Sequence, residues 1–188
     1  MNDPESKVLG DYRLREKLDE TGRTHIWLAE QVSVGRTVVV EELKETSHAA
    51  REAFVADVRA KASVDHPLIG SVYEAVTAGG HCYVARERLT GPTFADRLNA
   101  GATIKPSNFA PALRKLTEAQ LYLEGRNLAA APLTLEDIHL DDSGVLRINN
   151  PVVAGTREDN RSQADIAFVG DRLPPLIADA CPGATRTL

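Results

Sequence analysis

Residues 83–98 read YVARERLTGPTFADRL, and the chain changes character within this stretch. Its first half has the pattern of a buried strand, Gly91 and Pro92 interrupt that pattern, and a short helix pattern follows at 92–99. Strand patterns dominate the residues before it, at 11–17, 24–30, 37–43, 70–76 and 81–89, with a helix pattern at 48–64. Helix patterns dominate the residues after it, at 107–125, 165–173 and 174–180, with a strand pair at 138–140 and 145–148. The sequence therefore predicts an α+β fold in two lobes that join near residues 89–91.

The composition excludes several classes of protein. The chain has 188 residues, of which 43% are hydrophobic, so it can bury a sizeable core and is not expected to be disordered. Its net charge of -5 argues against a nucleic-acid partner, which would require a basic face. The sequence shows no signal peptide and no apolar run of the ~18 residues that a membrane span requires. We therefore expect a cytoplasmic protein, or the cytosolic part of a membrane-tethered one.

Four segments resemble, in order, segments of the bacterial eukaryotic-like (Hanks-type) Ser/Thr protein kinases. GRTVVVEELK (35–44) is similar to the third kinase strand, and FVADVRAKASVDHPLIGSVYEA (54–75) is similar to the C-helix and fourth strand. The stretch 83–98 resembles the fifth strand with the hinge, and EAQLYLEGRNLAAAPLTLEDIHL (118–140) resembles the catalytic segment. The resemblance implies a kinase-like bilobal fold. Its N-lobe, 1–89, would hold a five-stranded antiparallel sheet with a C-helix, and 90–188 would form a truncated, mainly helical C-lobe.

The resemblance also places the residues that would meet the phosphates of ATP. The positions of the three loop glycines are occupied by Asp19, Thr21 and Thr24, and the position of the strand lysine is occupied by Glu41. The C-helix glutamate position is occupied by Asp57, so two acids face each other where kinases have an ion pair. We expect these acids to repel each other or to recruit another cation, Arg23 or Lys61. Lys44 is no simple substitute, because side chains alternate along a strand and position 44 faces away from position 41.

The catalytic and metal-binding positions have changed as well. The resemblance places Pro132 where kinases have the general base, and proline has no proton to exchange. It places Asp137 at the metal-binding asparagine and Asn150 at the metal-binding aspartate, with Asn149 as the alternative. Asp137 and Asn150 could form a weak Mg²⁺ site, but a polar pair inside a packed hairpin is the commoner use of such residues.

The adenine pocket is expected to be filled. Val39 replaces a smaller alanine, His139 occupies the apolar floor position, and Arg86 occupies the gatekeeper position. An arginine near Asp19, Glu41 and Asp57 suggests a salt-bridged plug in place of ATP.

These changes predict a pseudokinase without a cofactor and without enzymatic activity, which acts as a protein-binding, regulatory signalling module. An alternative is a non-standard phosphotransferase that uses Arg23, Asp137 and Asn150. A further alternative is an adaptor that an active Ser/Thr kinase phosphorylates at Thr185 or Thr187. The interval between Asn150 and the DIAFVG helix at 165–170 is too short for the activation segment of kinases.

Overall fold

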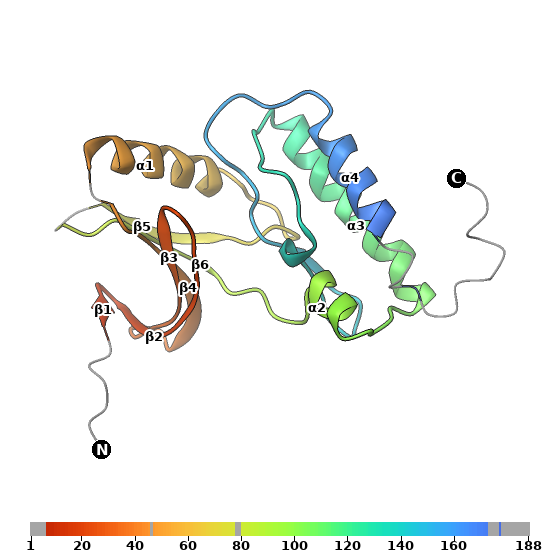
Figure 1. The fold of residues 1–188 in the computed structure, drawn as a ribbon, viewed down its shortest axis with the longest axis horizontal. Coiled ribbons are helices and arrows are strands. Elements are labelled where there is room, and N and C mark those ends of the chain that lie inside the picture. Colours follow the sequence, from red (N-terminus) through yellow and green to blue (C-terminus); the bar gives the residue numbers. More distant parts are fainter. Residues whose placement is uncertain (1–6, 46, 78–79, 173–176, 178–188) are drawn as a thin grey trace, which may run out of the picture. The chain divides into compact units, whose positions relative to one another are not determined.

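The computed structural model describes residues 7–45, 47–77, 80–172 and 177 (Figure 1). The chain divides into two compact units. The first unit lies within Met1–Asp65 and Gly70–Arg88, and the second lies within His66–Ile69 and Leu89–Leu188. No helix in the described ranges is long and apolar enough to cross a membrane.

The first unit is built on an antiparallel sheet in which the strands follow the order β1-β2-β3-β4-β6-β5. The predicted number of five strands is wrong, since the sheet has six in the part of the chain that is described. The extra strand, β1, has only two residues and pairs with the start of β2, so no alternation of polar and apolar residues reveals it. The strands are β1 (Val8–Leu9), β2 (Tyr12–Glu20), β3 (Thr24–Gln31), β4 (Arg36–Leu43), β5 (Val72–Val76) and β6 (Tyr83–Glu87).

Strand β4 has a core on each of its two faces. Its run of β-branched residues favours an extended backbone, and successive side chains point to opposite faces. Val38 and Val40 are fully buried on one face, in a cluster with Tyr12. Leu43 packs on the other face with Phe54, which lies on helix α1 (His48–Ala62). The sheet thus presents the side chain of Glu41 to the face that α1 covers.

Helix α1 begins and ends close to the predicted range of 48–64. The side chain of Ser47 accepts a hydrogen bond from the Ala50 N–H group and caps the first turn. Phe54 and Val58, one turn apart, are the buried residues of the helix. Because this buried face points at the sheet, α1 turns Asp57 and Arg59 to its flanks.

The second unit is mainly helical and contains a small hairpin. Thr93 and Asp96 form a capping box at the start of its first helix. Its last helix begins at Arg161, four residues before the predicted start at 165, and the predicted helix at 174–180 lies outside the described residues except for Ile177. The elements are α2 (Phe94–Asn99), α3 (Pro106–Gly125), the 3-10 turn η1 (Leu135–Asp137), β7 (Ile138–Leu140), β8 (Leu146–Ile148) and α4 (Arg161–Arg172).

Candidate functional site

The turn between β2 and β3 is closed by two threonines. Strand β2 continues through Asp19 and Glu20, so only residues 21–23 form the turn. The Thr21 hydroxyl oxygen accepts the Thr24 N–H group at 2.9 Å, and the two hydroxyl oxygens of Thr21 and Thr24 are also 2.9 Å apart. The backbone N–H of Thr21 donates to the carbonyl of Thr24 at 2.9 Å. These bonds occupy backbone and side-chain groups that an open phosphate-binding loop would leave free.

Glu41 lies beside this turn. Its carboxylate accepts a hydrogen bond of 3.1 Å from the hydroxyl of Thr24, which is buried. In the sheet, Glu41 lies opposite Ile26 on β3 and Val84 on β6. Residues directly opposite each other share a face, so the carboxylate points to the side of the sheet that faces α1.

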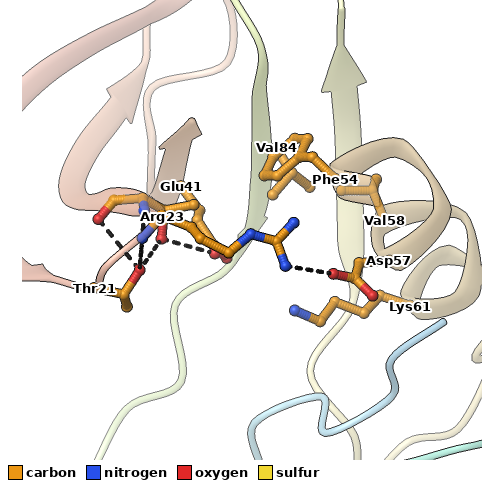
Figure 2. A pocket seen from close by; sticks show the side chains of 9 residues that line it. Thr21, Arg23, Glu41, Phe54, Asp57, Val58, Lys61 and Val84 are labelled. Carbon is orange, nitrogen blue, oxygen red and sulfur yellow. Dashed lines mark hydrogen bonds and ion pairs between the residues drawn. The ribbon is translucent and has the colours of Figure 1, made fainter. Parts of the chain in front are cut away.

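A small pocket joins the turn to helix α1 (Figure 2). Arg23 reaches from the turn to Asp57 on α1, and the guanidinium nitrogen is 3.7 Å from the carboxylate oxygen. Lys61, one turn further along α1, also lines the pocket. The cavity has a volume of about 110 Å³ and is lined by two acids, Glu41 and Asp57, and two cations. Arg23 therefore forms an ion pair with Asp57. It is one of the two cations, Arg23 and Lys61, that the sequence analysis expects near the two acids.

Lys44 binds at the outer side of the same turn. Its ammonium group donates to the Thr21 carbonyl oxygen at 2.5 Å and pairs with the carboxylate of Glu20, which also pairs with Lys17. The hydrogen bonds from Lys17 and Lys44 lower the pKa of Glu20 to about 2. Glu20 therefore serves as a structural partner of two lysines, and Lys44 is committed to the turn.

The positions around the predicted adenine pocket lie in two separate units. Val39 is buried on β4 and lies opposite Arg86 on β6, so both belong to the first unit and share the face of Glu41. His139 lies on β7 in the second unit, and its Nδ1 atom is 3.2 Å from the carbonyl oxygen of Gly91. The salt-bridged plug around Arg86 stays a prediction.

Pro132 lies in a loop that the second unit holds from both sides. Before it, the Ala131 N–H group donates to the Pro151 carbonyl at 2.9 Å. After it, the Leu133 N–H group donates to the carboxylate of Asp165 at 3.1 Å. The proline itself offers no side-chain group that can exchange a proton.

The sequence analysis did not identify Asp165 as the residue that holds the loop around Pro132. Its side chain is 3% exposed, and burial raises the pKa of its carboxyl group. The guanidinium group of Arg161, one turn earlier on the same helix, lies 4.0 Å from this carboxylate. The signal in the sequence is an acid that shares a helix face with the buried Val169 one turn later. An acid on a buried helix face requires a partner, and here the partner is the Leu133 N–H group.

Asp137 is used inside the hairpin region. One of its carboxylate oxygens accepts the Thr134 N–H and hydroxyl groups, at 3.1 and 2.8 Å. The other accepts the Asn149 amide at 3.4 Å, so the structure brings Asp137 to Asn149, which the sequence analysis keeps as the alternative to Asn150. The amide oxygen of Asn150 instead accepts the Val152 N–H group at 3.1 Å.

This arrangement does not fit a Mg²⁺ ion well. Both oxygens of Asp137 already accept hydrogen bonds, and Asn150 is bonded to its own loop. Within residues 7–45, 47–77, 80–172 and 177, there is no group of three His, Cys, Asp or Glu side chains that could hold a metal ion. The geometry favours the polar-pair interpretation over the metal site.

Comparison with known proteins identifies the relatives of the chain. No protein-family model matches it. Serine/threonine-protein kinase pkn2 of Myxococcus xanthus is 28% identical over 144 residues, which are 74% of this chain and 17% of the relative. Serine/threonine-protein kinase PrkC of Bacillus subtilis is 20% identical over 77% of this chain and 23% of the relative. These relatives are Ser/Thr protein kinases.

The fold of the chain is also similar to that of a protein kinase. The crystal structure of Rad53 1-466 in complex with AMP-PNP matches with a TM-score of 0.65 and 16% identity, over 76% of this chain and 39% of that one. Serine/threonine-protein kinase ATG1a of Arabidopsis thaliana is 23% identical over 74% of this chain. The chain spans about a fifth of the length of the curated relatives, between 17% and 23%.

The comparisons correct one expectation. The prediction that the chain is not an enzyme is wrong by this measure, because the relatives are named as Ser/Thr protein kinases, which points to an enzyme. That prediction rested on the changed side chains at the ATP positions. The phosphorylation sites predicted at Thr185 and Thr187 lie outside the described residues.

Proposed function

We propose that this chain is a kinase-like signalling module that regulates other proteins by binding them and that takes up ATP only weakly. The kinase-like fold and the kinase relatives support the signalling class. The observation that carries the weak nucleotide binding is Glu41, which lies where the resemblance places the lysine that kinases use to hold the phosphates.

The charges around Glu41 oppose a triphosphate. Glu41 and Asp57 both line the small pocket, and Arg23 is already paired with Asp57. A like-charge contact at ~4–6 Å costs on the order of 1–3 kcal/mol when it is moderately screened. Breaking the Arg23–Asp57 pair to free the cation would leave Asp57 without that partner.

The size of the pocket also argues for weak binding of ATP. Its volume of about 110 Å³ lies below the roughly 300–1,000 Å³ of pockets that bury small ligands. This pocket is therefore too small for the phosphates, and the threonine-locked turn would have to open first.

The variant Glu41→Lys tests this account. It removes the carboxylate from the pocket and restores the charge that the resemblance expects there. We expect it to bind ATP·Mg²⁺ about tenfold or more tightly than the unchanged chain, because one repulsive contact becomes attractive. Glu42→Lys is not a suitable control, because Glu42 is buried and paired with Lys7. Glu45→Lys, which makes the same charge change at an exposed position, is the control and should leave the affinity within a factor of about two.

A second candidate function is protein phosphotransfer, the activity that the names of the relatives state. It would require Arg23 to leave Asp57 and contact the nucleotide. Transfer of the γ-phosphate of ATP to a general protein substrate, lost in Arg23→Ala and kept in Arg114→Ala, would favour this candidate. Equal transfer by the two variants would count against a role of Arg23.

A further inference from the structure

A groove runs along helix α1 beside the end of strand β5. It consists of a larger cavity lined by α1 and Thr77, and of an adjoining smaller one lined by α1, Ala75 of strand β5 and Thr77. Helix α1 and strand β5 pack against each other (Figure 1). Their volumes are about 440 and 200 Å³, and both are lined by Val55, Arg59 and Thr77. The smaller cavity is also lined by Phe54, Val58 and Ala75, so four of its six lining residues are apolar. Cavities of this size suffice for apolar side chains of a partner.

The charge that the groove leaves unpaired is positive. Arg59 is exposed, and within the described part of the chain it has no ion-pair or hydrogen-bond partner. Glu52, the acid of the groove, lies 3.2 Å from His48. A partner with negative charge is therefore the one that this surface complements.

Strand β5 borders the groove and is the last strand of the sheet. Among the described residues it is hydrogen-bonded to β6 on one side alone. Its central residues are exposed, and its sequence, VYEAV, has a high propensity for strands. Such an edge offers unpaired N–H and C=O groups to an added strand.

Beyond a register shift between Val72 and Glu74, the side chains of residues 74–76 in β5 alternate in a way that joins the edge to the groove. Glu74 and Val76 belong to the face of the sheet that carries Tyr12, whereas Ala75 faces α1 and lines the groove. A strand added beside residues 74–76 would have the same alternation and would turn every second side chain toward α1.

We propose that this groove and edge form a docking surface for an extended, acidic segment of another protein. The segment pairs with the free edge of β5, places alternate apolar side chains in the groove, and sets its carboxylates against Arg59. Recognition by strand addition with side-chain pockets is a general mode of peptide binding. The inference rests on the proposed function, since it specifies where that protein binding takes place.

The test uses the full chain and a synthetic probe. The probe is a short fluorescein-labelled peptide in which Glu alternates with Val, and fluorescence polarisation measures its binding. We expect Arg59→Glu to weaken binding by on the order of tenfold, because an attractive charge at the groove becomes repulsive. The matched variant Arg114→Glu reverses another exposed arginine, on α3, and should stay within a factor of about two of the unchanged chain.

Three outcomes would overturn the proposal. One is the absence of probe binding by the unchanged chain, and another is an equal effect of the two arginine variants. The third is undiminished binding of a probe whose alternate backbone nitrogens are methylated, since methylation blocks pairing with a strand edge. Because neither Arg59 nor the probe involves nucleotide, tight ATP binding would overturn the weak-nucleotide part of the proposed function and leave this test unchanged. Circular dichroism checks that both variants remain folded.

Discussion

Asp165 is the side chain whose replacement tests the second unit most sharply. Its carboxylate accepts the N–H group of Leu133 at 3.1 Å, and both residues are buried. In Asp165→Ala that N–H group loses its partner in a place that water does not reach. A buried donor without a partner costs about 1–3 kcal/mol. This is a large part of the ~5–15 kcal/mol by which small domains are stable.

The variant Asp165→Asn separates the hydrogen bond from the charge. It keeps an oxygen that can accept the N–H group of Leu133, and it removes a carboxylate whose pKa is raised by burial. We therefore expect Asp165→Asn to be at least as stable as the unchanged chain at neutral pH, within about 1 kcal/mol. Asp171→Asn on the exposed side of α4 is the control for removing one charge from this helix.

The pH dependence has a definite sign. The pKa of Asp165 is higher in the folded chain than the ordinary value of 3.8. Between these two values the folded state binds more protons than the unfolded state, so the contribution of Asp165 to stability falls as the pH rises through this window. Asp165→Asn should flatten this decline.

Urea unfolding, followed by far-ultraviolet circular dichroism at several pH values, measures these effects. The assignment of Asp165 as the anchor of the Leu133 loop would be refuted by an Asp165→Ala variant as stable as the unchanged chain. It would be refuted equally if the asparagine variant lost as much stability as the alanine variant.

Two further predictions concern the first unit. Lys44→Ala should raise the pKa of Glu20 from about 2 toward 4.5, because Lys17 alone then stabilises the charged carboxylate. The lowered pKa of Glu20 stabilises the folded chain above pH 4.5, and this contribution is lost as the pH falls toward about 2. In Lys44→Ala this contribution should be smaller. Nuclear magnetic resonance titration of the Glu20 carboxyl measures this, and an unchanged pKa would contradict the Lys44 contact. Tyr12→Phe removes the hydroxyl that donates to Glu74 at 2.7 Å and should lower the free energy of unfolding by about 0.5–1.5 kcal/mol. Tyr73→Phe, at an exposed tyrosine, should leave it unchanged in the same urea titration.

Sequence patterns located the elements that bury one face. Helix α1 was predictable because Phe54 and Val58 repeat with the period of a helix, and strand β4 was predictable because its run of valines favours an extended backbone. The second half of β2 was not, since residues 15–20 are exposed on both faces and show no apolar alternation. Strand β1 is too short to have a period.

The candidate site also contains residues that the sequence indicates and contacts that it does not. Glu41 was assigned to the lysine position by the resemblance of its strand to the third strand of kinases, and that assignment stays a prediction. The bond between Asp165 and Leu133 joins residues 32 positions apart, and no local pattern reports a contact of that kind. The pairing of Arg23 with Asp57 is one of the options that the charges allow, and the sequence does not give the side-chain positions on which the pairing depends.

Calorimetric titration of ATP·Mg²⁺ into the unchanged chain tests the central claim most directly. The carboxylates of Glu41 and Asp57, the paired Arg23 and the small pocket predict a dissociation constant of about 1 mM or weaker, equivalent to no more than about 4 kcal/mol of binding free energy. A micromolar dissociation constant would contradict the account, because it would mean that the chain holds the nucleotide despite the acid where a lysine is expected.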